Sequence, residues 1–105
     1  MSLRGKKLGV LLSVSPDHAN FHHALRLSET ALACGVDVYL YCIDEAVKGV
    51  DDPRLQPLKT AGLKLFACAY AAQRRGMVMT DKATFAGLTI VSDLIASTDR
   101  FVSFN

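Results

Sequence analysis

Two hydrophobic patterns alternate along this chain: short runs in which nearly every residue is apolar, and longer segments with apolar residues at helical spacing. Near-continuous apolar runs are typical of parallel strands that helices cover on both faces. They predict strands at residues 8–14, 37–43, 63–67 and 100–104, with a brief fifth strand at residues 77–79. The alternation therefore predicts an α/β protein, a three-layer α/β/α sandwich with a four- or five-stranded parallel sheet.

Four helices are expected between these strands. The first begins near Asn20 and ends at Gly35, a residue type common just after a helix. The second is predicted over residues 53–61, because proline is favoured at the first helical position. A short third helix ends just before Gly76, and the fourth is predicted near residues 88–97.

Composition fits a single domain over residues 1–105. Half of the residues are apolar (50%) and 21% are charged, with a net charge of +2. This balance can bury a core, and it excludes a disordered chain. Basic residues occur in pairs and never in a run with aromatics interleaved, so no nucleic-acid partner is expected. No apolar run approaches the length of a membrane span, so no membrane partner is expected either.

The chain has three cysteines, Cys34, Cys42 and Cys68. An odd number without a C-x-x-C pair argues against a disulfide framework and against a zinc knuckle, and it favours a reducing cytoplasm. Cys42 lies among apolar strand residues, so we expect it to pack in the core; a role as a resolving cysteine is the weaker alternative. Cys34, at the last turn of the first helix, is also expected to pack.

Cys68 is the strongest candidate for chemistry because it joins the third predicted strand to the helix that follows. In open α/β sheets, ligands bind outside the carboxyl ends of the strands. The free N–H groups of a helix's first turn favour negative charge, and the thiolate is the nucleophilic form of cysteine. The alternative is that Cys68 is a small buried apolar residue, the usual fate of a free cysteine.

Three further residues are candidates for binding. His18 and Asn20 follow the first strand at the same carboxyl edge as Cys68, so topology predicts that they line a shared pocket. Arg75 lies about two helical turns beyond Cys68, too far to touch its sulfur. It either complements the helix C-terminus before Gly76 or forms part of a basic rim that docks an acidic partner or a second subunit.

Other chemistries lack their signatures. His18, His22 and His23 cluster beside Asp17, but His18 is expected in the loop before the helix and no third ligand is fixed, so no metal site is predicted. The chain has no G-x-G-x-x-G or P-loop motif, so dinucleotide or P-loop binding lacks its phosphate cradle, and it has no G-x-S-x-G nucleophile elbow. No organic cofactor is expected. Asp44 after the second strand is expected to cap a helix or turn.

Residues 68–76, which read CAYAAQRRG, resemble the cysteine segment of the DsrE/DsrF-like family, which includes TusD-like sulfur relay proteins. The resemblance extends over nearly the whole chain. It includes the opening strand at residues 8–14, the helix residues 24–26, the entry to the second strand at residues 35–38 and the closing segment at residues 98–104.

This resemblance implies that Cys68 accepts sulfane sulfur as a persulfide and passes it to a protein partner, as a sulfurtransferase-like carrier in the cytoplasm. It also implies a homo-oligomer, a trimer or a hexamer, with sulfur donor and acceptor proteins as partners. Two alternatives stay open: a non-catalytic binding or assembly module with a buried, unreactive Cys68, and a redox-sensing thiol. The solvent exposure of Cys68 separates the carrier from the module.

Overall fold

The computed structural model describes residues 2–105 and contains a five-stranded sheet in which all neighbouring strands are parallel. The strand order is β4-β3-β2-β1-β5. The strands are β1 (Lys7–Leu12), β2 (Asp37–Cys42), β3 (Lys64–Cys68), β4 (Thr84–Ala86) and β5 (Arg100–Phe104). The predicted fold class is therefore confirmed, with five strands.

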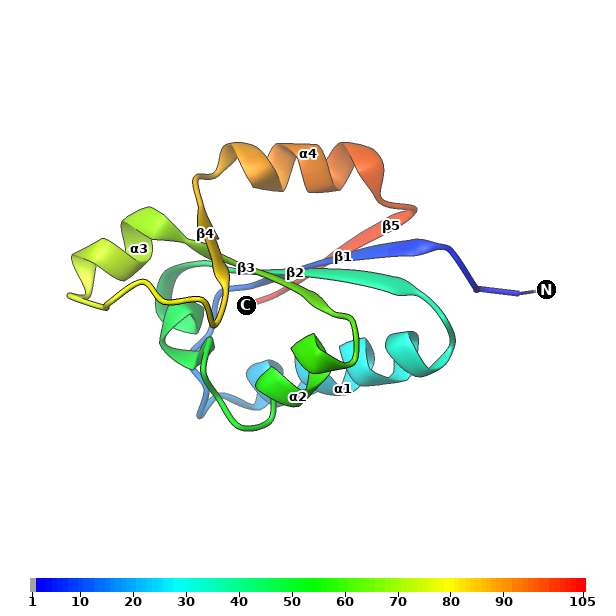
Figure 1. Ribbon diagram of the computed structural model, residues 1–105, viewed down its shortest axis with the longest axis horizontal. Coiled ribbons are helices and arrows are strands. Elements are labelled where there is room, and N and C mark those ends of the chain that lie inside the picture. Colours follow the sequence, from blue (N-terminus) through cyan, green and yellow to red (C-terminus); the bar gives the residue numbers. More distant parts are fainter. Residues whose placement is uncertain (1) are drawn as a thin grey trace.

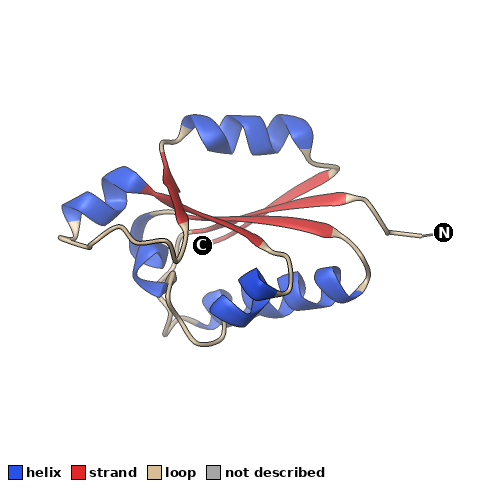
Figure 2. Cartoon of the chain, viewed as in Figure 1, coloured by secondary structure: helices blue, strands red, loops and turns tan. Residues whose placement is uncertain are grey.

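Helices cover both faces of this sheet. They are α1 (Ala19–Ala33), the 3₁₀ helix η1 (Asp44–Gly49), α2 (Gln56–Thr60), α3 (Ala69–Arg74) and α4 (Thr89–Ser97). Figures 1 and 2 show α1 and α2 on one side of the sheet and α4 alone on the other, while α3 projects beyond the carboxyl end of β3. No helix within residues 2–105 has the length and apolar character needed to cross a bilayer.

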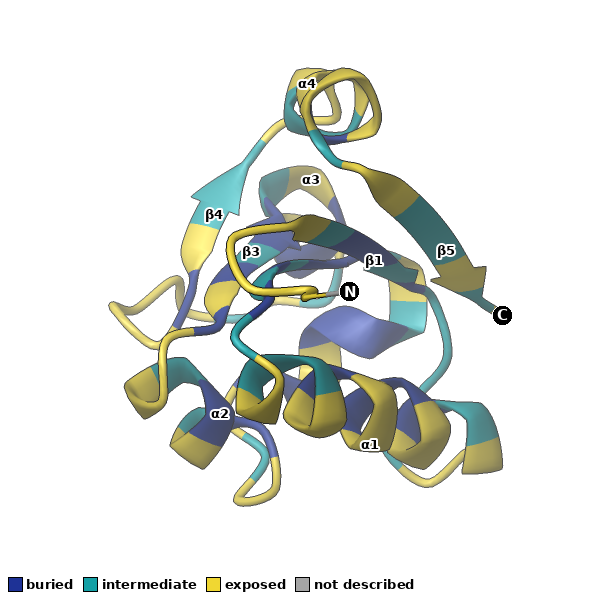
Figure 3. Ribbon diagram, turned by 90° about the vertical axis from the view of Figure 1, so that its right-hand side faces the viewer, coloured by how far each residue is buried: buried dark blue, intermediate teal, exposed yellow. Residues whose placement is uncertain are grey.

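The side that carries α1 holds most of the fully buried sheet residues. Phe21, Ala24, Leu25 and Ser28 are the buried residues of α1, spaced so that they share one helical face. Ser28 is satisfied within the helix, because its hydroxyl donates to the Ala24 carbonyl at 2.8 Å. In Figure 3 the face of α1 turned toward the sheet is buried and its outer face is exposed.

Strand register assigns the sheet residues to two faces. Leu12, Cys42 and Ala67 are neighbours in register and lie on the face toward α1 and α2, called here the α1 face. Tyr41 and Phe66 are also paired and lie on the opposite face, called here the α4 face. Two cysteines that end adjacent strands therefore point in opposite directions, because Cys68 lies two residues beyond Phe66.

One predicted strand is wrong. Residues 77–79 form no strand and pair with none of the described strands, and Val78 there is 81% exposed. The fifth strand is instead β4, three residues long, which pairs with the edge of β3. An edge strand this short carries too few residues for an alternating pattern to show.

Two smaller predictions are also wrong. The second helix begins at Gln56, three residues after Pro53, because the Asp52 carboxylate accepts hydrogen bonds from the Arg54 backbone and side chain and holds a turn there. Cys34 does not pack in the core: it lies just after α1 and is exposed.

Candidate functional site

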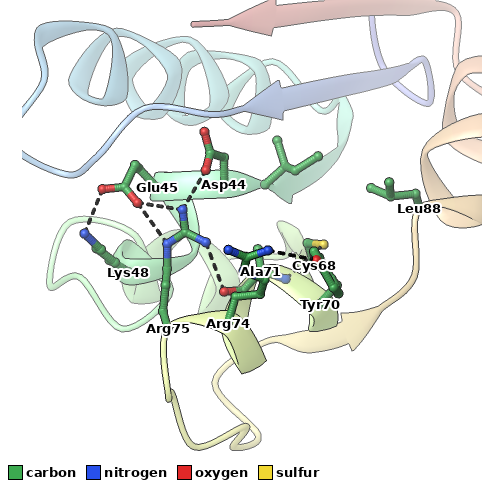
Figure 4. A pocket seen from close by; sticks show the side chains of 10 residues that line it. Asp44, Glu45, Lys48, Cys68, Tyr70, Ala71, Arg74, Arg75 and Leu88 are labelled. Carbon is green, nitrogen blue, oxygen red and sulfur yellow. Dashed lines mark hydrogen bonds and ion pairs between the residues drawn. The ribbon is translucent and has the colours of Figure 1, made fainter.

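A pocket of about 550 Å³ opens at the carboxyl end of the sheet, between η1, α3 and the beginning of α4. Figure 4 shows its lining. The lining residues are Ile43, Asp44, Glu45, Lys48, Cys68, Tyr70, Ala71, Arg74, Arg75 and Leu88. In open parallel sheets ligands bind outside the carboxyl ends of the strands, and this pocket lies beyond those ends of β2 and β3.

Cys68 ends β3 and is also the N-cap residue of α3. Its backbone is extended (φ −69°, ψ 115°), so its side chain turns back toward the first turn of the helix. There Sγ accepts a hydrogen bond from the Ala71 N–H at 3.4 Å. The residue is only 3% exposed, yet it lines the pocket, so the sulfur is reached through the pocket and not from the outer surface.

Arg75 lines the same pocket, fixed by four contacts. Its Nε and Nη2 bind Glu45 Oε2 at 2.9 and 2.7 Å, and Nη2 also binds Asp44 Oδ1 at 2.6 Å. Its Nη1 donates to the Ala71 carbonyl at 3.1 Å. The hydrogen bond to Glu45 is the main reason that the pKa of the guanidinium is raised. Arg75 thus joins η1 to α3, and its charge is largely compensated by the two carboxylates.

Lys48 completes this charge cluster. Its Nζ lies 2.7 Å from Glu45 Oε1, and Lys48 first, then Arg75, lowers the pKa of the Glu45 carboxyl. The pocket therefore holds two carboxylates that are both bound to cations.

Arg74 differs from Arg75 in its partner. Its Nη1 donates to the Tyr70 hydroxyl at 3.0 Å, and its guanidinium lies 5.7 Å from the centre of the Tyr70 ring. Tyr70 is 65% exposed, so this pair forms an aromatic and cationic rim at the pocket mouth.

Asp44 adopts an unusual backbone conformation at this site. Its φ of +54° is the only positive value among the non-glycine residues in the described part of the chain. Such residues are uncommon, although Asp and Asn tolerate this region best. This turn carries the chain from β2 into η1 and leaves the Asp44 side chain beside Arg75.

Tyr41 supports the site from the sheet. It lies on the α4 face and is fully buried, and its hydroxyl donates to the Ala86 carbonyl at 3.0 Å. Burial, followed by the neighbouring Cys68 sulfur, raises the pKa of this phenol well above its usual value. Cys42 lies on the other face, where burial raises its pKa to about 12 and keeps the thiol protonated.

The structure does not bring His18 and Asn20 to Cys68. His18 is the N-cap of α1, and its Nδ1 accepts from the Asn20 N–H at 3.0 Å. The Asn20 amide donates to the Asn105 carbonyl at 2.8 Å. Neither residue is part of the pocket lining. Within residues 2–105, no group of three or more His, Cys, Asp or Glu side chains is arranged to hold a metal ion.

Sequence reasoning missed the roles of Glu45, Lys48 and Tyr41 here. Asp44 and Glu45 directly follow β2, the strand next to β3, so the rule that places ligands at carboxyl strand ends was the available signal. No sequence signal marks Tyr41, because a tyrosine in an apolar strand is an ordinary core residue.

Together these features define a small parallel α/β sandwich with a cysteine at a strand end, facing a pocket rimmed by charged and aromatic residues. The chain belongs to the DsrE/DsrF-like family, whose pattern matches residues 6–104. No curated protein matches the chain.

Two solved structures share the fold. The ychN protein from E. coli superposes with a TM-score of 0.77 at 17% identity, over 94% of this chain and 99% of that one. A conserved protein of unknown function from Bacteroides thetaiotaomicron, BT1422, gives a TM-score of 0.77 at 15% identity, over 94% and 95% of the two chains. At these identities the likeness establishes the fold alone.

Proposed function

We propose that this protein is a sulfur carrier that accepts sulfane sulfur on Cys68 as a persulfide and passes it to a protein partner. The observation that carries the proposal is the position of Cys68. It is the described cysteine that both lines the pocket at the carboxyl edge and receives a helix N–H on its sulfur. Membership in the DsrE/DsrF-like family adds support, because the resemblance of residues 68–76 to the family's cysteine segment implies a sulfur-carrying cysteine at this place.

The transfer needs one thiol and no cofactor. The Cys68 thiolate attacks the outer sulfur of a donor persulfide, R–S–SH; the sulfur–sulfur bond of the donor breaks and R–S⁻ leaves with its electron pair. Cys68 is then Cys–S–SH, and an acceptor thiolate takes the outer sulfur in the same way. Each step exchanges one S–S bond for another, so no external oxidant or reductant is consumed.

Protein donors and acceptors suit this pocket because its rim offers contacts for a protein surface. Tyr70 and Leu88 are 65% and 56% exposed, and Arg74 lies beside Tyr70. Aromatic residues and arginine are enriched where proteins bind one another. A cytoplasmic location, where thiols stay reduced, fits this chemistry.

A homo-oligomer, trimeric or hexameric, is part of the proposal. A single nine-residue helix, α4, covers the α4 face, and Leu11, Tyr39, Phe66 and Phe101 there are only partly buried. Ile95 on α4 is 55% exposed. A second copy of the chain would remove this apolar surface from water. Light scattering of the purified protein tests this directly, and a particle mass of 11.4 kDa, that of one chain, would contradict it.

A non-catalytic binding or assembly module is the second candidate, and the burial of Cys68 favours it. At 3% exposure, Cys68 matches the expectation for a packed thiol, and the pocket alone gives reagents access to it. In that case the pocket recognises a ligand or partner while the sulfur stays inert.

Intact mass after incubation with a sulfane-sulfur donor separates the two candidates. Exposed Cys34 is a competing thiol, so the experiment uses Cys34→Ser as the parent protein. The carrier predicts an adduct of about 32 Da that dithiothreitol removes and that Cys68→Ala abolishes. If the parent protein gains no adduct although circular dichroism and melting show that it is folded, the carrier is refuted and the non-catalytic module remains.

A further inference from the structure

Tyr41 is a fully buried tyrosine that neighbours Cys68. It sits on β2, on the α4 face, where its register partner on β3 is Phe66. Cys68 lies two residues further along β3 on that same face, and its own register partner on β4 is Ala86. The Tyr41 hydroxyl donates to the Ala86 carbonyl at 3.0 Å, so the side chain crosses β3 beside Cys68.

A tyrosine hydroxyl has one proton to donate. In the structure that proton is directed at Ala86, a carbonyl in an edge strand that is only partly buried. The pKa of Tyr41 is raised, first by burial and then by the neighbouring Cys68 sulfur, so the phenol keeps its proton at neutral pH. The group next to the sulfur is therefore a neutral donor with a rotatable O–H.

An anion at Cys68 is short of donors. Among the described residues the sulfur receives one hydrogen bond, from the Ala71 N–H at 3.4 Å, and the residue is only 3% exposed, so water can reach the sulfur through the pocket alone. A buried negative charge with a single donor is costly, and charge-assisted hydrogen bonds are about twice as strong as neutral ones. Turning the phenol O–H so that it donates to the sulfur anion, and no longer to the neutral Ala86 carbonyl, therefore stabilises the ionised site.

We propose that Tyr41 is a second residue of the Cys68 site: its hydroxyl, held by Ala86 in the resting protein, rotates to donate to the sulfur when Cys68 is a thiolate or carries a persulfide. No covalent bond is made or broken and no proton is transferred in this step. The inference rests on the proposed function, because it assigns Tyr41 a role in the same sulfur chemistry.

The first test compares two proteins, the Cys34→Ser parent and the same parent carrying Tyr41→Phe. The quantity measured in each is the pH profile of iodoacetamide alkylation at Cys68. Tyr41→Phe keeps the ring and removes only the hydroxyl, so the expected result is a profile midpoint about one pH unit higher and alkylation roughly tenfold slower near neutral pH. The ionisable groups that line the pocket are unchanged in this variant: Asp44, Glu45, Lys48, Arg74 and Arg75.

Tyr39→Phe is the matched control. Tyr39 lies two residues earlier on the same strand and face, and its ring contacts Lys64 Nζ, 5.3 Å from the ring centre. The proposal predicts that this variant keeps the parent profile. An equal shift in Tyr39→Phe and Tyr41→Phe would overturn the proposal, and so would an unshifted profile in Tyr41→Phe.

A second substitution guards against a loss of folding in Tyr41→Phe. Replacing Tyr41 by 3-fluorotyrosine keeps the hydroxyl and makes it a stronger donor, so the profile midpoint is expected to move to lower pH, opposite to Tyr41→Phe. Shifts in the same direction would contradict hydrogen-bond donation. A parent protein whose Cys68 resists alkylation while folded and gains no persulfide would instead refute the carrier itself, so the two failures are distinguishable.

Discussion

Cys42 and Cys68 end neighbouring strands of one sheet, yet their surroundings differ because they point to opposite faces. Cys42 faces α1 and α2, is fully buried, and has a pKa raised to about 12 by burial. Cys68 lies on the α4 face, receives an N–H from the next helix and lines a pocket of about 550 Å³. Both cysteines are buried, so what distinguishes them is that Cys68 also lines the pocket whereas Cys42 does not.

The same contrast holds for the two faces as a whole. On the α1 face Val10, Leu12, Val38 and Leu40 are 0% exposed, while residues on the α4 face such as Leu11 are only partly buried. Because the α1 face buries more of its apolar side chains, we expect it to contribute more to the free energy of unfolding than the α4 face.

Truncating one leucine on each face of β1 should give the largest difference in the free energy of unfolding. Leu12→Ala on the α1 face is expected to cost about 2–5 kcal/mol of unfolding free energy, because it leaves a cavity in a closed core. Leu11→Ala, the adjacent residue on the open face, is expected to cost about 1–2 kcal/mol, since its side chain is already partly hydrated. Urea denaturation measures both. Equal losses would show that the two faces do not differ in packing.

Because Cys42 is buried, the free energy of unfolding should fall as the pH becomes alkaline. Its pKa rises from 9.0 to about 12 on folding, so above pH 9 the unfolded chain releases this proton while the folded chain keeps it. Stability contributed by Cys42 is therefore complete below pH 9 and is lost as the pH rises toward 12, at roughly 1 kcal/mol per pH unit.

Cys42→Ala isolates this effect, since Tyr41 and the other titrating groups are present in both proteins. The quantity to compare is the slope of unfolding free energy against pH between about pH 9 and 10.5, which should be shallower in Cys42→Ala. Parallel slopes would mean that Cys42 ionises as easily in the folded chain as in the unfolded one.

The smallest expected effect concerns Arg75. Arg75→Gln removes the contacts to Asp44 and Glu45, but these groups are partly exposed, so the loss of stability should be smaller than that of Leu11→Ala and should shrink with added salt. Arg74→Gln is the control, because Arg74 binds the Tyr70 hydroxyl instead. Melting curves of the two variants are compared at low and high salt. A loss of stability in Arg75→Gln that does not depend on salt would argue that the ion pairs with Asp44 and Glu45 are not its cause.

The regular elements could be predicted from the sequence where hydrophobic periodicity was strong. Strand β5 has the predicted bounds, and α1 ends before Gly35, whose φ of +81° is the left-handed conformation expected just after a helix. The sequence also predicted Cys68 at the junction of β3 and α3. Each of these features depends on residues close together in the chain.

Features that depend on distant partners could not be predicted. Strand β4 exists because three residues reach the free edge of β3, and nothing local distinguishes them from the more apolar segment at residues 77–79. Arg75 and Glu45 are thirty residues apart and meet only once η1 and α3 pack together. The bond between Tyr41 and Ala86 spans an intervening strand, so it follows from sheet order and from no motif.

The most direct test of the difference between Cys42 and Cys68 is site-resolved alkylation of the folded protein. Native protein is treated with iodoacetamide for increasing times, quenched, unfolded and digested, and each cysteine is quantified by mass spectrometry, with exposed Cys34 as the internal reference. Cys68 should be labelled in the folded state, while Cys42 should be labelled only as fast as the protein unfolds. Labelling of Cys68 at the same slow rate as Cys42 would show that both are core residues and would contradict the assignment of Cys68 as the reactive thiol.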